Sequence, residues 1–170
     1  EAPEVIKALY NEGFKHIVMM TGDSERTARS VADKLGIKEY YSEVLSEDKA
    51  AFVKQAHKNG SRVVMIGDGV NDAPALSEGD AGVAVNSGAA ITKEIADITV
   101  TGDDLYSLIT MKRLADNLMR RIHGNYRFIM SFNTALIVLG VAGVLPASTS
   151  ALLHNTSTLA ISLKSMTNLL

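Results

Sequence analysis

Residues 67–76 read GDGVNDAPAL and directly follow the apolar run RVVMI at residues 62–66. The stretch places two carboxylates and one carboxamide, from Asp68, Asp72 and Asn71, in a glycine-flanked turn after a predicted buried strand. Mg²⁺ prefers oxygen ligands, usually one or two carboxylates with phosphate oxygens, and glycine lets the backbone approach a ligand closely. An ordinary turn is the alternative, but it does not need three oxygen-bearing side chains. The stretch therefore predicts a Mg²⁺ and phosphate site with Asp68 as metal ligand and Asp72 in support.

Charge is distributed unevenly along the 170 residues, whose formal net charge is −2. The chain has no basic excess, so nucleic acid is not implied as a partner. It contains no cysteine, which excludes disulfides and thiolate metal sites. No acidic residue follows Asp116, and Lys164 is the one charged side chain in residues 128–170. We predict three segments, a partial catalytic domain (1–103), a connecting helix (104–127) and an apolar part (128–170).

Short apolar runs alternate with helical patterns through the first segment. The predicted strands are 16–20, 40–45, 62–66, 81–85 and 98–100, and the predicted helices are 3–13, 24–35, 46–57, a short one from 73, and 89–96. This alternation favours an α/β fold, with a parallel, Rossmann-like sheet covered by helices on both faces. Ligands of such sheets bind at the carboxyl ends of the strands. Thr21 and Asp68 both follow a predicted strand, so we expect them to converge.

Thr21, Gly22 and Asp23 suit phosphate binding. The Thr21 hydroxyl and the Gly22 N–H can donate to a phosphate oxygen, helped by the positive end of the following helix. Asp23 has an alternative role as the N-terminal charge of that helix.

Lys49 is the best candidate for a cation held by Asp72. Its ammonium group would stabilise the charge of transferring phosphoryl oxygens, although a solvated lysine in the first turn of a helix is the alternative. Asn71 can donate its amide to the phosphate or to an attacking group.

The last part of the chain predicts two membrane-spanning helices. Residues 128–145 carry no charge and are long enough to cross a bilayer. The basic residues before them place that end in the cytoplasm. Residues 151–170 form a second, more polar helix. A buried helical hairpin in a soluble protein is the alternative.

Polar residues of the second helix recur at helical spacing, Asn155 and Thr158 among them. His154 lies close to this stripe, and Asn133 is the corresponding polar residue of the first helix. Two interpretations stay open, interhelical hydrogen bonding and a site for a transported ion. The imidazole of His154 suits Zn²⁺, Cu, Ni²⁺ and Fe.

The motifs together resemble the phosphorylation domain of P-type ATPases, in the haloacid dehalogenase superfamily. The matching residues are TGD (21–23), Lys49, GDGVNDAPAL (67–76), DAGVAV (80–85) and ADI (96–98). The resemblance implies the following roles: phosphoryl binding by Thr21 and Gly22, phosphate stabilisation by Lys49, Mg²⁺ binding by Asp68, and support by Asn71 and Asp72. It implies that ATP is bound mainly by a domain outside this sequence.

One element of the family pattern is missing. The aspartate that becomes phosphorylated lies in a DKTG motif, whereas Asp48-Lys49 is followed by Ala50. We expect the nucleophile and the nucleotide-binding domain to lie upstream of Glu1, and this piece alone to be inactive.

Two helices after the phosphorylation domain resemble the heavy-metal subgroup. Phe132-Asn133 lies where copper pumps carry Tyr-Asn, but HNTST at residues 154–158 replaces their Met-x-x-Ser-Ser. This disfavours copper and leaves Zn²⁺, Mn²⁺, Co²⁺ or Fe²⁺. The resemblance implies an integral protein of the cell membrane that exports a metal cation, with residues 1–127 in the cytoplasm. Its expected partners are the lipid bilayer and the remaining domains of the same pump.

Two other functions are open. A soluble phosphatase of the same superfamily would have a DxD nucleophile and no membrane segment. A membrane-anchored binding module without enzymatic activity would keep the fold and bind no Mg²⁺.

Overall fold

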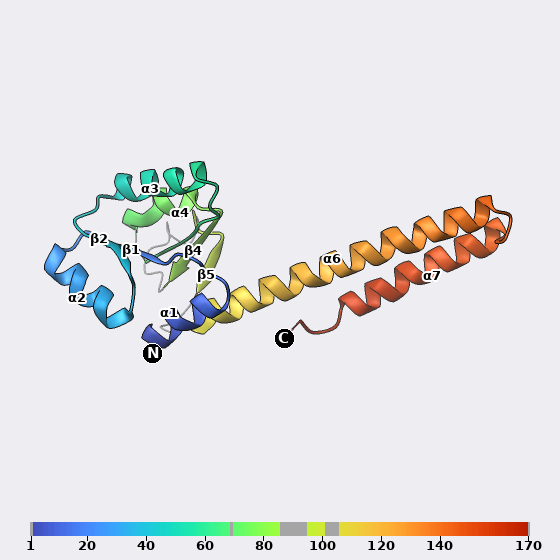
Figure 1. The fold of residues 1–170 in the computed structure, drawn as a ribbon, viewed down its shortest axis with the longest axis horizontal. Coiled ribbons are helices and arrows are strands. Elements are labelled where there is room, and N and C mark those ends of the chain that lie inside the picture. Colours follow the sequence, from blue (N-terminus) through green and yellow to red (C-terminus); the bar gives the residue numbers. More distant parts are fainter. Residues whose placement is uncertain (1, 69, 86–94, 101–105, 170) are drawn as a thin grey trace. The chain divides into compact units, whose positions relative to one another are not determined.

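The computed structural model describes residues 2–68, 70–85, 95–100 and 106–169. It divides into two compact units, residues 1–110 and residues 111–170 (Figure 1). Each unit is described by itself below. The division into segments at residues 103 and 127 stays a prediction.

The first unit contains two small parallel sheets. One pairs β1 (Val18–Met20) with β2 (Glu39–Tyr41), and the other has the strand order β3 (Val64–Gly67), β4 (Ala81–Val85), β5 (Ile98–Val100). Every described strand pair is parallel, which confirms the predicted α/β class with a parallel sheet. The predicted helix 89–96 falls mainly on residues outside the described part of the chain.

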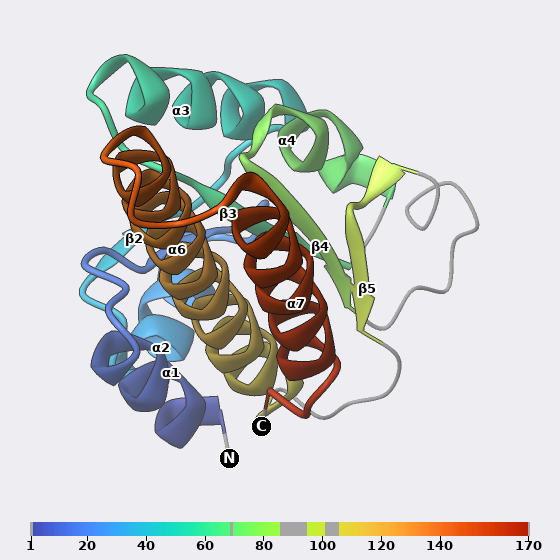
Figure 2. The same ribbon diagram turned by 90° about the vertical axis from the view of Figure 1, so that its right-hand side faces the viewer.

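The helices of this unit follow the predicted pattern closely. They are α1 (Ala2–Asn11), α2 (Glu25–Leu35), α3 (Ser46–Lys58) and α4 (Ala73–Glu78), the last preceded by a 3₁₀ turn at Val70–Asp72. Helices α3 and α4 lie side by side on one side of the strands, and α1 lies on the other (Figures 1 and 2). Gly36 ends α2 in the left-handed conformation, at φ +71°, as glycine after a helix commonly does.

The core of the first unit lies between α3, α4 and β3. Val53 and Leu76 are 1% exposed and Met65 is 8% exposed, and Met20 of β1 packs against this cluster. Helix α4 approaches β4 so closely that a Cβ atom on Gly82 would lie 2.7 Å from the carbonyl oxygen of Leu76. These contacts place the carboxyl end of β3 beside the amino-terminal half of α3.

The second unit is an antiparallel helical hairpin of α6 (Tyr106–Val141, which begins in the first unit) and α7 (Ala147–Ser165). Arg121 of α6 donates hydrogen bonds to the carbonyl oxygens of Ser165, Thr167 and Asn168, at 2.6–3.1 Å. These carbonyls lie at the end of α7 and beyond it, so the guanidinium group satisfies acceptors that a helix end leaves open.

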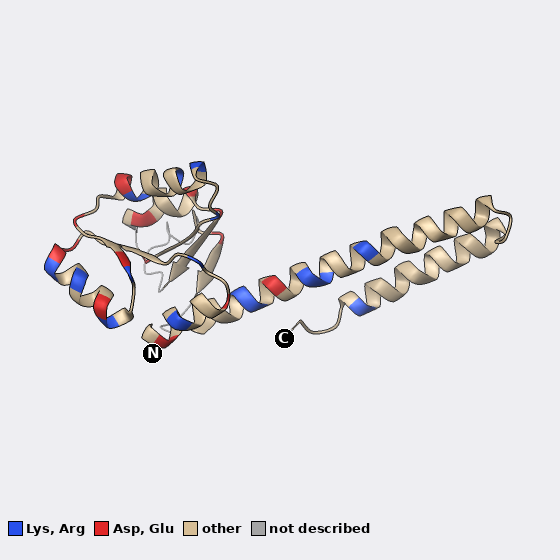
Figure 3. Cartoon of the chain, in the orientation of Figure 1, with Lys and Arg blue, Asp and Glu red and all other residues tan. Residues whose placement is uncertain are grey.

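The structure contradicts the prediction of two transmembrane helices. Within the described ranges, no helix is both long and apolar enough to cross a membrane. Helix α6 ends at Val141, so the uncharged segment 128–145 is not one continuous helix. Its helical part covers about 21 Å at 1.5 Å per residue, against about 30 Å of hydrocarbon. Helix α7 is short of apolar residues because Ser and Thr recur along it. Figure 3 shows that acidic and basic side chains are concentrated on the first unit and the adjacent part of α6.

Candidate functional site

Lys49 and Asp72 form an ion pair in which Lys49 Nζ lies 2.7 Å from Asp72 Oδ1. Only 13% and 12% of the two side chains are exposed. Lys49 lies in the first turn of α3, and Asp72 ends the 3₁₀ turn that follows β3. The pair therefore joins two segments that are 23 residues apart in the sequence. The predicted contact between these two residues is present.

Gly67 makes room for this pair at the end of β3. A Cβ atom on Gly67 would lie 2.6 Å from Asp72 Cβ and 2.9 Å from Asp72 Oδ2. Real Cβ atoms essentially never make contacts under 3.0 Å, so any larger residue would displace Asp72. The first glycine of GDGVND is thus required by the carboxylate five residues later.

Asp68 and Asn71 are exposed at the same end of β3. Asp68 has a carboxylate that can reach a cation from solvent, whereas Asp72 is committed to Lys49. Within the described ranges, no three His, Cys, Asp or Glu side chains gather as a metal site. The single exposed carboxylate of Asp68 suits Mg²⁺, which commonly takes one or two protein carboxylates and completes its shell with phosphate oxygens and waters.

The TGD loop, Thr21 to Asp23, follows β1 at the end of the other sheet. The backbone N–H of Asp23 donates to Thr21 Oγ1 at 3.1 Å, and this bond uses an oxygen lone pair of the hydroxyl. The hydroxyl hydrogen is then suited to donate to a ligand. Gly22 and Asp23 are exposed, and α2 begins directly after them at Glu25. The helix therefore directs its positive end toward the loop.

A hydrogen-bonded segment, residues 41–45, connects the TGD loop with Lys49. The Thr21 N–H donates to Tyr41 O at 3.0 Å, and the Val44 N–H donates to Thr21 O at 3.0 Å. The segment then enters α3 at Ser46, three residues before Lys49. The predicted strand 40–45 consequently ends at Tyr41, since the next residues bond to the loop instead of extending the ladder. Leu45 is the N-cap of α3.

Two structural carboxylates were not predicted as such. Asp80 accepts hydrogen bonds from the Val63 N–H, from Arg62 and from His57, at 2.8–2.9 Å. The bond from Val63, followed by that from Arg62, lowers the pKa of Asp80 to about 2. Asp97 accepts from the Gly82 N–H at 2.8 Å and ties the start of β5 to β4. Asp80 and Asp97 belong to the motifs DAGVAV and ADI, but their hydrogen-bond partners can be identified only in the folded chain.

The polar residues of the hairpin are only partly brought together. His154 Nδ1 lies 2.9 Å from Asn133 Oδ1, and both residues line a groove together with Leu136 and Gly140. The Thr158 hydroxyl donates to the His154 carbonyl at 3.0 Å, within its own helix. Asn155 is exposed. The contact between His154 and Asn133 supports interhelical hydrogen bonding, whereas an ion site in the hairpin stays a prediction.

Comparisons with known proteins show which sequences resemble this chain. Residues 1–80 match the family model of haloacid dehalogenase-like hydrolases. The chain is similar in sequence to P-type ATPases that are named for metal export or metal transport. It is 40% identical to a manganese-exporting P-type ATPase of Mycobacterium tuberculosis over 95% of its length, and 46% identical to a copper-transporting P-type ATPase of Rhizobium leguminosarum bv. viciae over 82%. It spans 23% and 16% of these two relatives.

Solved structures show the same relationship. A zinc-transporting PIB-type ATPase in its E2.Pi state matches 96% of this chain with a TM-score of 0.90 and 29% identity, and the chain covers 27% of it. The catalytic domain of the CPx-ATPase CopB-B matches 66% with a TM-score of 0.63 and 34% identity, and the chain covers 44% of it. A phosphoserine phosphatase shares the fold at 22% identity, with a TM-score of 0.57 over 64% of this chain and 64% of its own.

Proposed function

We propose that this chain is part of an ATP-driven pump for a heavy-metal cation, and that its first unit supplies half of the phosphorylation site. The observation that carries the proposal is the buried pair of Lys49 and Asp72 beside the exposed Asp68. The ammonium group of Lys49 suits a negatively charged phosphoryl group. The exposed carboxylate of Asp68 beside it suits a doubly charged cation. The homologues that match nearly the whole chain are metal-transporting P-type ATPases, which supports the same proposal.

Each site residue has a proposed role at the transferring phosphoryl group. The Thr21 hydroxyl and the Gly22 N–H donate to its oxygens, with Asp23 holding the loop through its N–H bond to Thr21. Lys49 stabilises the negative charge that spreads over these oxygens in the transition state. Asp72 fixes Lys49 in place.

The remaining two residues of the turn complete the site. Asp68 would hold Mg²⁺, which when bound neutralises phosphate charge. Asn71 is exposed beside it and can donate its amide to the phosphate or to the attacking group. ATP is proposed to be bound mainly by a domain outside this sequence.

The phosphorylated aspartate is proposed to lie in the remainder of the pump. No Asp of this sequence is followed by Lys-Thr-Gly. The strands β1 and β3 belong to different sheets, each with a single partner among the described strands. Ile66 of β3 is 40% exposed, although β3 contributes Met65 to the core. A strand from elsewhere in the pump that joins the two sheets would cover Ile66 and bring its aspartate between Thr21 and Asp68.

The transported ion is proposed to be a divalent transition metal. Relatives of similar identity are named for manganese, zinc and copper, so similarity alone does not select among them. His154 offers an imidazole ligand in the hairpin groove, with Asn133 as its neighbour and with Asn155 and Thr158 on the same helix. The pump as a whole is proposed to lie in the cell membrane, with its phosphorylation site on the cytoplasmic side, where ATP is available.

A phosphatase of the same superfamily is the weaker alternative. The phosphoserine phosphatase matches 64% of this chain, whereas the zinc-transporting ATPase matches 96%. A phosphatase function would also leave the hairpin of α6 and α7 without a role.

Phosphoenzyme formation in the full-length pump tests the proposal. Asp68→Ala should abolish incorporation of the γ-phosphate of ATP into the protein, because the phosphoryl group loses its metal. Asp33→Ala, which removes an exposed carboxylate from α2, serves as the matched control and should leave incorporation unchanged. Substantial metal transport by Asp68→Ala would contradict the assignment. Stimulation of ATP hydrolysis by Zn²⁺, Mn²⁺, Co²⁺, Fe²⁺ and Cu⁺ then identifies the ion.

A further inference from the structure

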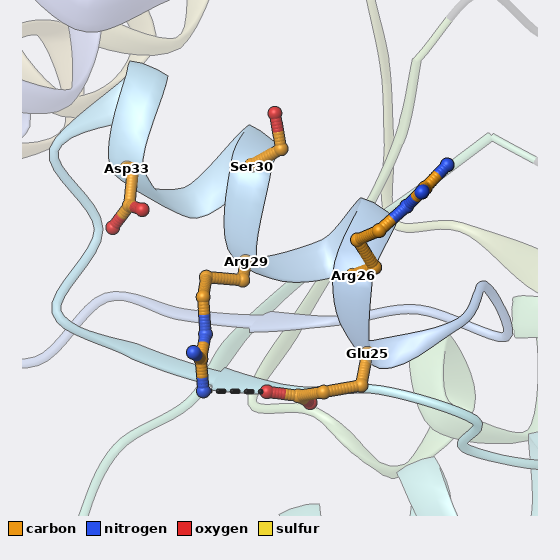
Figure 4. Close-up of a pocket in the computed structure, with 5 residues that line it drawn as sticks. All are labelled: Glu25, Arg26, Arg29, Ser30 and Asp33. Atoms are coloured by element: carbon orange, nitrogen blue, oxygen red, sulfur yellow. Dashed lines mark hydrogen bonds and ion pairs between the residues drawn. The ribbon is translucent and has the colours of Figure 1, made fainter.

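The carboxylate of Glu25, the first residue of α2, accepts hydrogen bonds from three side chains. Its Oε1 accepts from the Tyr40 hydroxyl at 2.8 Å and from Arg29 at 3.2 Å, and its Oε2 accepts from the Ser42 hydroxyl at 2.8 Å. Arg29 Nε also donates to the Tyr40 oxygen at 3.1 Å. Figure 4 shows Glu25 and Arg29 directed toward each other along a shallow pocket on α2, with Asp33 farther along the helix.

These hydrogen bonds favour the ionised form of the carboxylate. The bond from Ser42, then that from Tyr40, lowers the pKa of Glu25 below its ordinary value. A glutamate is an anion at neutral pH, so both donors are bonded to a full negative charge. Such charge-assisted bonds are shorter and stronger than those between neutral groups.

The partners of Glu25 flank the residues that hold the TGD loop. Tyr40 and Ser42 lie on either side of Tyr41, whose carbonyl accepts from the Thr21 N–H. Glu43, which follows Ser42, has a positive φ of +54° and donates its N–H to the Asp23 carbonyl at 2.9 Å. A residue other than glycine reaches this conformation at a cost. The Ser42 bond to Glu25 secures the backbone immediately before that strained position.

The same segment continues to Lys49. Val44 bonds to the Thr21 carbonyl, and α3 begins two residues later with Lys49 in its first turn. Glu25 follows the TGD loop by two residues on the other side. The Glu25–Ser42 bond and the Thr21–Tyr41 bond therefore join the TGD loop to the 41–45 segment at two points, and that segment leads to Lys49.

We propose that Glu25 is a positioning residue for the phosphate site, and that its bonds to Tyr40 and Ser42 fix the TGD loop relative to Lys49. Glu25 does not touch the phosphoryl group. It acts through the 41–45 segment, by holding the donors of Thr21 and Gly22 in the orientation that a phosphate needs. This inference rests on the proposed function of the same site. Preorganised donors matter most where charge develops, so the effect falls on phosphate binding and turnover and not on nucleotide binding.

Inhibition of the full-length pump by orthovanadate, a phosphate mimic, tests the inference. Glu25→Ala should raise the inhibition constant of vanadate about fivefold and lower kcat by a similar factor, in the range expected for loss of one or two hydrogen bonds. The KM for ATP should stay unchanged. Glu25→Gln keeps one acceptor oxygen but loses the charge, so it should restore part of the affinity. Asp33→Ala removes an acidic side chain from the same helix and should behave as wild type.

A second set of variants separates positioning from loss of folding. Ser42→Ala and Tyr40→Phe each remove one donor, so each should show part of the effect, and neither should add to it when combined with Glu25→Ala. Unchanged vanadate affinity in Glu25→Ala, or full additivity of the combined variants, overturns the inference. Asp68→Ala distinguishes a failure of the proposed function from a failure of the role of Glu25. If it retains phosphoenzyme formation, the proposed function fails. If it loses phosphoenzyme while Glu25→Ala binds vanadate normally, only the role of Glu25 fails.

Discussion

The ammonium group of Lys49 lies 2.7 Å from Asp72 Oδ1, beside a glycine that has no room for a side chain. Asp72 occupies the space that a side chain on Gly67 would need, and Lys49 donates a hydrogen bond to its carboxylate there. The pair is nearly buried, so both charges depend on each other for compensation. Asp68 and Asn71 belong to the same turn as Asp72 and are exposed to solvent.

Asp72→Ala should lower the free energy of unfolding by about 3 kcal/mol, because it leaves the Lys49 ammonium buried without its partner. Urea denaturation of the chain, followed by circular dichroism, measures the change. Lys54→Ala is the matched control on the same helix, since Lys54 pairs with Glu78 at 3.4 Å and is 60% exposed. Its loss should change stability by less than about 1 kcal/mol. Equal effects of the two variants would contradict the structural role of the buried pair.

Gly67→Ala should displace Asp72 and with it Lys49. A Cβ atom 2.6 Å from Asp72 Cβ cannot be accommodated without movement, and such overpacking costs about 1–3 kcal/mol. Phosphoenzyme formation should fall together with stability. Gly124→Ala provides the contrast, because a Cβ atom at Gly124 would meet no heavy atom within 4 Å and alanine favours a helix interior. A Gly67→Ala pump with wild-type phosphorylation would show that the turn has more freedom than this geometry allows.

Asp80 should make the stability of the first unit depend on acidic pH. Its pKa of about 2 in the folded chain lies below the value of about 3.9 for a free aspartate, so the ionised carboxylate stabilises the fold above about pH 4. This contribution is lost as the pH falls through about 2. Asp80→Asn should therefore be less stable than wild type near neutral pH, with the difference narrowing between about pH 4 and pH 2.

Urea midpoints for wild type and Asp80→Asn at a series of pH values measure this difference. Asp33→Asn, the same change of residue type on the exposed surface of α2, is the control, and the narrowing seen with Asp80→Asn should exceed any change with this variant. A constant gap between wild type and Asp80→Asn down to about pH 2 would show that the bonds from Val63, Arg62 and His57 are not specific to the ionised form.

Local sequence patterns predicted most of the first unit. The strand at residues 81–85 and the strand at 98–100 lie where the apolar runs indicated, and the helix predicted at 24–35 ends at Leu35. Such features depend on the spacing of apolar residues and on backbone preferences that neighbouring residues determine. The contact between Lys49 and Asp72 was also predicted, because a phosphoryl group needs a cation beside it and that cation needs a carboxylate to hold it.

Other features depended on contacts that no local pattern contains. The predicted strand 40–45 stops at Tyr41 because its last residues bond to the TGD loop. The apolar segment 128–145 looked long enough for a membrane, but the helix ends at Val141, and residues 142–145 belong to the turn that follows it. The roles of Glu25 and Asp80 follow from partners on distant segments, such as Ser42 and Val63.

The sequence by itself determined the parallel α/β class and the oxygen-rich turn after β3, because apolar periodicity and the chemistry of carboxylates are properties of neighbouring residues. Only the tertiary structure decided that the Lys49–Asp72 pair is nearly buried while Asp68 stays exposed, and that Glu25 accepts a hydrogen bond from Ser42. These assignments depend on which groups the packing of α3 and α4 on the strands buries and which it leaves in solvent. Burial decides whether a carboxylate must find a cation within the protein or is available to bind one from outside.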